Sequence, residues 1–108
     1  MYKLRETYEA VQDVTGFALY MVEKFKNPKA AADFLESYDK KVNGLRIFPF
    51  GYRGVGFEYR GYEIKMKPYH TYNIFFVVDP FEKEIIILRI LKDREDWQMI
   101  FSNLKQAK

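Results

Sequence analysis

The sequence contains no cysteine and only one histidine, His70. Without cysteine the chain forms no disulfide and offers no thiolate for catalysis, and one histidine does not supply a His-based structural metal site. Gly51, Gly54 and Gly56 are too scattered for a phosphate-binding loop, and no Gly-Lys-Ser/Thr follows them. We therefore expect neither a metal nor a cofactor.

Long apolar runs and a strong charge excess are also missing. No run approaches the roughly 18 apolar residues of a membrane span, and the N-terminus leads into an amphipathic stretch rather than a signal-peptide core. We expect a cytoplasmic protein with no membrane contact. The net charge is +3, from 18 Lys and Arg against 15 Asp and Glu, which is compatible with a nucleic-acid or acidic-peptide partner but does not require one.

Aromatic residues, by contrast, are abundant. The 108 residues form one domain, residues 1–108, because two domains would each be too small to bury a useful core. Hydrophobic residues make up 48% of the chain, which indicates a packed core rather than disorder. Ten Phe, nine Tyr and one Trp exceed what so small an interior holds. We therefore expect an exposed aromatic patch, which usually marks a binding surface.

Two helices are predicted in the first half of the chain. The first has one apolar face, with residues at steps of three and four: Val11, Val14, Ala18, Met21, Val22 and Phe25. Asn27-Pro28 begins the second, because Asn suits an N-cap and Pro the first helical position. Its apolar face comprises Ala31, Phe34, Leu35, Tyr38, Val42 and Leu45, and it should end by Phe48. With so short a turn, the two helices form an antiparallel hairpin.

The second half has the two-residue periodicity of strands. We predict strands over residues 57–67, 72–78 and 84–91, paired antiparallel, after a short first strand over residues 2–4. Asp93 then suits the N-cap of a short helix through Trp97, Ile100, Phe101 and Leu104. The predicted fold class is α+β: an N-terminal helical hairpin packed on a small antiparallel β-sheet, with a short C-terminal helix.

This order of elements, with several segments that occupy it, resembles the RelE/ParE superfamily of toxins from type II toxin–antitoxin systems. The similar segments are residues 10–14, 26–31, Leu45 with Phe48-Pro49, Gly61-Tyr62, residues 72–79, and residues 86–91 followed by 94–97. The resemblance covers nearly the whole chain. It implies a RelE/ParE-like fold and a toxin that inhibits growth.

The resemblance leaves the molecular target open among three alternatives. The leading hypothesis is a ribosome-dependent mRNA endoribonuclease that needs no metal, and its rival is a non-enzymatic, ParE-like toxin that binds and poisons DNA gyrase. The third is an inactive member that still binds an antitoxin. Asn73 stands where nucleases of the family carry a basic residue, and Lys92 where many members carry His or Tyr. The long helical hairpin and Asn73 favour the gyrase alternative.

Three cations favour the nuclease, because metal-free RNA cleavage needs positive charge on the phosphate and a group that moves a proton. Lys65 and Lys67 alternate on one strand and so share a face, and with Arg94 they match basic positions of the family. We predict that all three converge on one surface, Arg94 folding back beside the exposed face of the strand. The alternative is a solvated sheet face with an ordinary arginine at a helix start.

Five further residues are weaker candidates. His70 has the side chain that titrates nearest neutrality and is a possible general acid or base, although an exposed turn histidine fits the sequence better. Tyr69 and Tyr72 are candidates for stacking on RNA bases, with Lys92 as a further RNA contact, although Tyr72 fits a core position better. Glu63 suits a surface ion pair with Lys65 better than a general base.

The partners follow from the resemblance. All three alternatives imply a small cognate antitoxin whose C-terminal segment wraps an exposed apolar groove of the toxin. The nuclease alternative adds the ribosome and mRNA, and the other adds DNA gyrase. Operator DNA is expected to be contacted only through the antitoxin.

Overall fold

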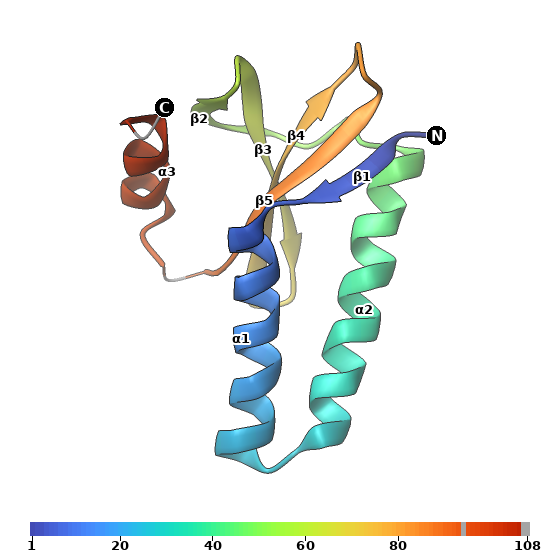
Figure 1. The fold of residues 1–108 in the computed structure, drawn as a ribbon, viewed down its shortest axis with the longest axis vertical. Coiled ribbons are helices and arrows are strands. Elements are labelled where there is room, and N and C mark those ends of the chain that lie inside the picture. Colours follow the sequence, from blue (N-terminus) through green and yellow to red (C-terminus); the bar gives the residue numbers. More distant parts are fainter. Residues whose placement is uncertain (94, 107–108) are drawn as a thin grey trace.

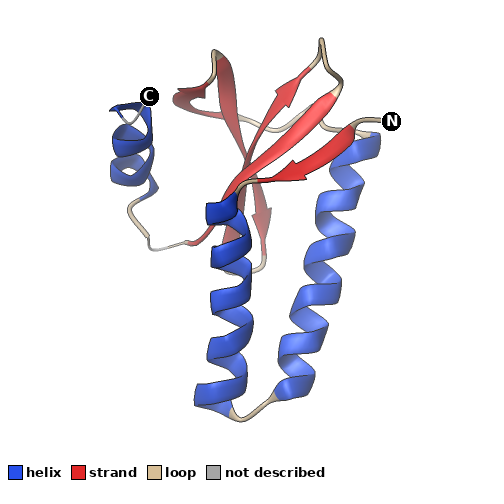
Figure 2. Cartoon of the chain, in the orientation of Figure 1, coloured by secondary structure: helices blue, strands red, loops and turns tan. Residues whose placement is uncertain are grey.

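The computed structural model describes residues 1–93 and 95–106, and it has a helical hairpin, a five-stranded sheet and a short last helix (Figures 1 and 2). The elements are β1 (Lys3–Glu6), α1 (Tyr8–Phe25), α2 (Pro28–Ile47), β2 (Gly54–Tyr59), β3 (Tyr62–Tyr69), β4 (Tyr72–Asp79), β5 (Glu84–Lys92) and α3 (Trp97–Gln106). The expected α+β fold, with hairpin, sheet and C-terminal helix, is confirmed.

Local capping explains the bounds of the hairpin helices. Thr7 caps α1 by accepting a hydrogen bond from the Ala10 N–H at 3.1 Å, and Lys26 ends it in the left-handed conformation, with φ of 52°. Asn27 caps α2 through the Ala30 N–H at 3.0 Å, with Pro28 as the first helical residue. The predicted role of Asn27-Pro28 is therefore confirmed.

The strands follow the order β1-β5-β4-β3-β2. Strands β2 to β5 form an antiparallel meander, while β1 pairs parallel with β5, from Lys3 opposite Glu84 to Glu6 opposite Ile87. The antiparallel prediction is thus confirmed for the meander, and the parallel edge strand was not foreseen. The first strand also begins and ends later than predicted.

The prediction of one strand over residues 57–67 is wrong, because these residues form parts of two strands. Arg60 and Gly61 both have positive φ, of 55° and 85°, and make the tight turn between β2 and β3. Two residues of positive φ match the twist of the flanking strands, so the chain reverses there without a loop. Tyr59 consequently lies opposite Tyr62.

Helices cover both faces of the sheet, which therefore has two apolar layers. The first layer lies between the sheet and the α1–α2 hairpin and includes Ile74, Phe76, Ile85, Ile87 and Ile90 from the sheet. The second lies under α3 and includes Ile64, Phe75, Val77, Ile86 and Phe101. We call these two sides of the sheet the hairpin face and the α3 face.

Two predictions about the helices need correction. Val11, Val22, Phe25 and Leu35 belong to the apolar helix faces that we expect to pack on the sheet, but they are 38–66% exposed. The hairpin extends past the sheet (Figure 1), so its far end has only the partner helix to pack against. Asp93 is not the cap of α3: the helix begins at Trp97, and Asp96 accepts a hydrogen bond from the Met99 N–H at 3.2 Å.

Among the described residues, no helix combines the length and apolarity that a membrane crossing requires. Within the same part of the chain, no three or more His, Cys, Asp or Glu side chains are grouped so that they could hold a metal ion.

Candidate functional site

Lys65 and Lys67 lie on the hairpin face of the sheet. In the β3–β4 register Lys65 is opposite Phe76 and Lys67 opposite Ile74, and both partners belong to the core beneath the hairpin. Opposed residues of an antiparallel pair project to the same side. The two lysines therefore share a face, and it is the hairpin face rather than the α3 face.

Both ammonium groups are already engaged by the chain around Tyr52. Lys65 Nζ donates to the Tyr52 carbonyl oxygen at 3.3 Å and lies 3.8 Å from a Glu63 carboxylate oxygen. Lys67 Nζ donates to the carbonyl oxygen of Lys41, in α2, at 3.1 Å and lies 5.5 Å from the centre of the Tyr52 ring. The Lys65 side chain is 24% exposed. Through these contacts the two ammonium groups attach the loop after α2 to strand β3, in addition to carrying charge.

The predicted third cation, Arg94, lies outside the described residues. The helix that follows it is described, and Trp97 and Phe101 of α3 pack on Phe75, with ring centres 5.8 and 4.9 Å away. Phe75 projects to the α3 face, opposite to the face of Lys65 and Lys67. The apolar stripe of α3 therefore covers the side of the sheet opposite to the two lysines, while the convergence predicted for Arg94 falls outside the described residues.

The β3–β4 turn places the next three candidates differently. Tyr69 is 2% exposed, and its hydroxyl donates to the Phe34 carbonyl oxygen at 3.1 Å. Its ring is in the core, so it has no free face for the stacking on an RNA base expected from the sequence. Tyr72 is half-buried against Phe17, with ring centres 4.6 Å apart, and burial raises the pKa of its hydroxyl. His70 is an exposed turn residue with φ of 56°.

Lys92 lies opposite Tyr72 at the end of β5. Its Nζ is 5.7 Å from the ring centre of Phe17 and 5.4 Å from that of Tyr20. It therefore belongs to an aromatic group on the flank of α1, where the cation is attracted to the ring faces. This group contains Tyr72 and Lys92 but neither Lys65 nor Lys67, so the candidate site residues form two separate clusters.

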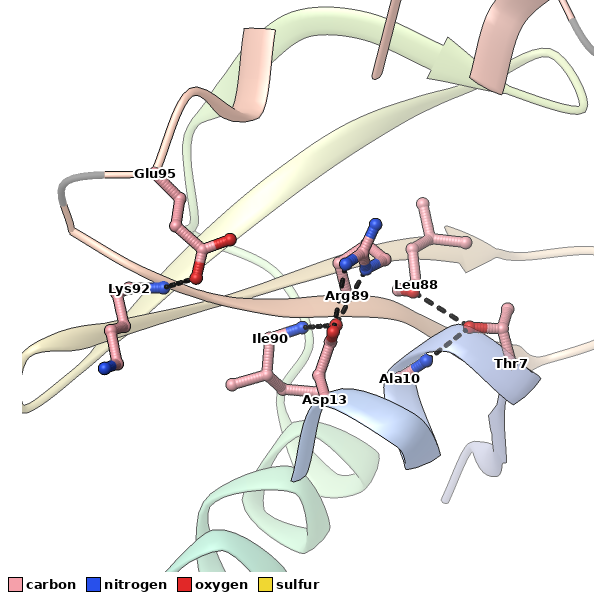
Figure 3. Close-up of polar contacts among 8 residues, drawn as sticks. All are labelled: Thr7, Ala10, Asp13, Leu88, Arg89, Ile90, Lys92 and Glu95. Atoms are coloured by element: carbon pink, nitrogen blue, oxygen red, sulfur yellow. Dashed lines mark hydrogen bonds and ion pairs between the residues drawn. The ribbon is translucent and has the colours of Figure 1, made fainter. Parts of the chain in front are cut away.

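Sequence reasoning missed a pair that joins α1 to β5. Arg89 donates two hydrogen bonds to the Asp13 carboxylate, from Nε at 2.7 Å and from Nη2 at 2.9 Å, and the Ile90 N–H donates to the same carboxylate at 3.0 Å (Figure 3). The Asp13 side chain is 13% exposed and that of Arg89 is 25% exposed. The hydrogen bond to Asp13 raises the pKa of Arg89 above its ordinary value. An arginine inside an otherwise apolar strand was the available signal, because such a charge requires a partner.

Strand β5 has a bulge beside Arg89, and the residue that caps α1 bonds to the main chain there. Phe75 is opposite Arg89 and Phe76 is opposite Ile87, so Leu88 has no partner on β4. The Thr7 hydroxyl donates to the Leu88 carbonyl oxygen at 2.8 Å (Figure 3). The Thr7 N–H donates to the Ile87 carbonyl oxygen at 3.0 Å. The first turn of α1 thus covers the edge of β5 where β1 ends.

As the aromatic surplus predicted, apolar side chains reach the surface; most of them lie in two regions, while Phe81 and Met99 are exposed elsewhere. One is the outer side of the hairpin, with Tyr8, Val11, Leu19, Tyr20, Val22, Phe25 and Leu35. The other follows the end of α2, where Ile47 and Phe48 are 71% and 66% exposed and the Phe48 and Phe50 ring centres are 6.5 Å apart. Both are surfaces on which another protein gains apolar contacts.

A cleft of about 300 Å³ lies between the start of α1, β5 and α3. Leu88, Tyr59 and Ile100 line its apolar wall, and Glu9 and Arg89 lie at its rim. Because this cleft opens on the α3 face, it is separated from Lys65 and Lys67 by the sheet.

Comparison with known proteins gives one family and one fold. The family model described as "ParE toxin of type II toxin-antitoxin system, parDE" matches residues 4–97. A solved structure titled "Chromosomal ParDE TA system from P. aeruginosa" has a TM-score of 0.68 and 23% sequence identity, covering 85% of this chain and 96% of that chain. At that identity the likeness concerns the fold alone. No curated protein matches the sequence.

Proposed function

This chain belongs to the ParE toxin family of type II toxin–antitoxin systems, and we propose that it poisons DNA gyrase by binding it rather than cleaving mRNA. The supporting observation is the state of the two lysines that nuclease chemistry would need. Each ammonium group donates to a main-chain carbonyl oxygen of its own chain, and both lysines are on the hairpin face of the sheet. Stabilising a pentavalent phosphate requires donors that point at the substrate.

A second observation supports the same proposal. Asn73, which stands where nucleases of the family carry a basic residue, is 8% exposed and donates from Nδ2 to an Asp93 carboxylate oxygen at 2.9 Å. Its side chain therefore fixes the connection to α3 instead of facing a substrate. Lys92, beside the Phe17 ring, could supply a positive charge to RNA. Tyr69, however, is buried and so cannot stack on an RNA base.

A toxin that works by binding needs an accessible surface more than a set of reactive groups. The exposed apolar residues on the hairpin and after α2 meet that need. We assign the cognate antitoxin to part of the same apolar surface: its C-terminal segment covers the toxin and neutralises it. In this proposal operator DNA is contacted by the antitoxin, and the toxin has no DNA site of its own.

The test measures both activities of one preparation. The toxin, produced with its antitoxin and released from it, is added to purified DNA gyrase in a supercoiling assay and to a translation extract with a reporter mRNA. We expect loss of supercoiling, trapped DNA breaks and intact mRNA. Cleaved mRNA with unaffected gyrase would overturn the proposal.

Substitution of the lysines separates the alternatives further. Lys65→Ala with Lys67→Ala should retain gyrase inhibition within a few-fold, while a nuclease that uses them would lose about 10²–10³ in rate per lost donor. Lys29→Ala is the matched control, because its ammonium group pairs with Asp33 on the exposed side of α2. A large loss of toxicity confined to the Lys65 and Lys67 variant, with the fold intact, would restore the nuclease alternative.

A further inference from the structure

Helix α1 carries two apolar stripes, and only one of them is used inside the chain. Ala10, Val14 and Ala18 are buried in the core, and Phe17 packs on Tyr72 of the sheet. The second stripe consists of Tyr8, Val11, Thr15, Leu19 and Val22. Its apolar members are 72%, 44%, 52% and 38% exposed. We call these five residues the outer stripe.

The outer stripe is continuous and free of charge. At about 100° per residue its members fall within an arc of about 80°, on the opposite side of the helix from Phe17. The charged residues of α1 are Glu9, Asp13, Glu23 and Lys24, and all of them fall outside that arc. An exposed helix face with no charge over four turns is typical of a helix that packs on another helix.

The spacing of the outer stripe is symmetric. Its members are separated by three, four, four and three positions, so the pattern is the same in both directions about Thr15. Suppose that a second copy of α1 runs antiparallel with Thr15 opposite Thr15. Tyr8 of each copy then meets Val22 of the other, and Val11 of each copy meets Leu19 of the other. A two-fold interface requires such self-complementarity, because each residue pair occurs twice. Binding to a partner of unrelated sequence does not require a symmetric stripe.

We propose that the chain forms a two-fold homodimer in which the outer stripes of two α1 helices pack antiparallel, with Thr15 at the axis. Thr15 is the only polar member of the stripe, and at the axis its hydroxyl meets another hydroxyl. Any slip of the register would bury it against apolar side chains, so it sets the alignment as polar core positions do in coiled coils. The hairpin extends past the sheet (Figure 1), which leaves much of α1 clear for a second helix.

The size of the stripe sets the strength of the dimer. Helix α1 has 18 residues, which corresponds to a length of about 27 Å. One such helix pair buries less than the roughly 800 Å² per partner of a standard stable complex. The dimer therefore forms reversibly and depends on protein concentration, so a tighter-binding antitoxin on the hairpin would displace it.

The absence of cysteine allows a direct test of the axis. Helix axes packed about 9–10 Å apart bring the facing Cα atoms at the crossing to about 4.4–5.4 Å, which a disulfide can span. Thr15→Cys, in the full chain released from its antitoxin, should form a disulfide-linked dimer under mild oxidation. Thr71→Cys is the matched control, since Thr71 is exposed in the β3–β4 turn. We expect dimer formation about tenfold faster at position 15 than at position 71.

A second measurement follows association without a cross-link. Sedimentation velocity should show a monomer–dimer equilibrium for the unmodified chain and a monomer for Leu19→Glu. Phe81→Glu, which changes an 87% exposed residue in the β4–β5 turn, should still dimerise. Equal cross-linking at positions 15 and 71, or a monomer at every concentration, would overturn the proposal. So would a monomeric chain in which Leu19→Glu abolishes antitoxin binding, because the antitoxin would then be the sole occupant.

Discussion

Arg89 and Asp13 tie strand β5 to helix α1 across 76 residues of sequence, through hydrogen bonds of 2.7 and 2.9 Å. The same carboxylate accepts the Ile90 N–H at 3.0 Å, so one side chain neutralises a guanidinium group and satisfies an edge amide of the sheet. Arg89 also lies at the rim of the cleft beneath α3. This pair therefore fixes the hairpin to the sheet at the position of the β5 bulge.

Asp13→Asn should lower the free energy of unfolding by about 2–3 kcal/mol, because it leaves a largely buried guanidinium group without its counter-charge. Denaturant unfolding followed by circular dichroism measures the change. Asp33→Asn is the control, since the Lys29–Asp33 pair is exposed on the surface of α2 and should contribute about 0.5 kcal/mol or less. Equal losses in the two variants would show that the pair does not hold α1 to the sheet.

The sequence predicted the fold because its signals are local. The Asn27-Pro28 boundary and the alternation of Tyr62, Ile64 and Met66 act within a few residues, and α2 begins and β3 lies where these signals stand. The Arg60-Gly61 turn escaped notice because Tyr59 and Tyr62 continue the apolar pattern on both sides of it. Helical spacing alone also failed to separate the two apolar stripes of α1, since the pattern does not reveal which stripe meets the sheet.

The candidate site was less predictable, because it depends on which face of the sheet each helix covers. The alternation of Lys65 and Lys67 correctly indicated a shared face, but nothing in β3 itself indicates that α2 lies over it. The position of α3 is decided by Phe101 and Trp97 packing on Phe75, residues more than twenty positions away. Long-range packing of this kind has no signal in a single sequence.

Tyr69→Phe should destabilise the protein although it removes only one oxygen atom. The hydroxyl donates to the Phe34 carbonyl oxygen in a buried setting, and its removal loses this buried hydrogen bond, at a cost of about 1 kcal/mol. Tyr72→Phe, at the opposed and half-buried position, is the comparison and should change the unfolding free energy less. Urea unfolding of the two variants at neutral pH checks the order, and a larger effect at Tyr72 would contradict it.

Asp79 should make the β4–β5 turn sensitive to acid. Its carboxylate accepts hydrogen bonds from the Glu82 N–H at 3.1 Å, the Phe81 N–H at 3.0 Å and the Tyr62 hydroxyl at 3.1 Å. The bond from Glu82 is the main cause that lowers the pKa of Asp79 in the folded chain. A carboxyl group whose pKa is lower when folded stabilises the protein above its unfolded pKa, and this contribution is lost as the pH falls through the folded pKa.

The unfolding free energies of the unmodified chain and of Asp79→Asn should therefore differ at neutral pH and converge on acidification. Chemical denaturation at a series of pH values from neutral to strongly acidic measures the gap. Asn keeps an acceptor oxygen and removes the charge, so the comparison isolates the ionised form. A gap that stays constant with pH would mean that the turn does not depend on the carboxylate charge.

Asn73 should matter for the attachment of α3 more than for any reaction. Its side chain is 8% exposed and donates to Asp93, whose own N–H donates to the Thr71 carbonyl oxygen at 2.9 Å. Asn73→Ala removes the side-chain bond, a loss of about 1 kcal/mol that should speed amide hydrogen exchange in α3 several-fold. Exchange in α1, which is held to β5 by other contacts, serves as the internal control.

Asn73→Arg tests the proposed function with the basic residue that nucleases of the family carry. We expect no mRNA cleavage and unchanged gyrase inhibition, because a side chain at this position does not reach the hairpin face. Asn73 lies opposite Leu91 in the β4–β5 register, and Leu91 belongs to the apolar layer under α3, whereas Lys65 and Lys67 project to the other side of the sheet. An arginine there meets the Asp93 carboxylate instead of a phosphate. If the variant gained mRNA cleavage that Lys65→Ala then abolished, the two faces would share one site and the gyrase proposal would fail.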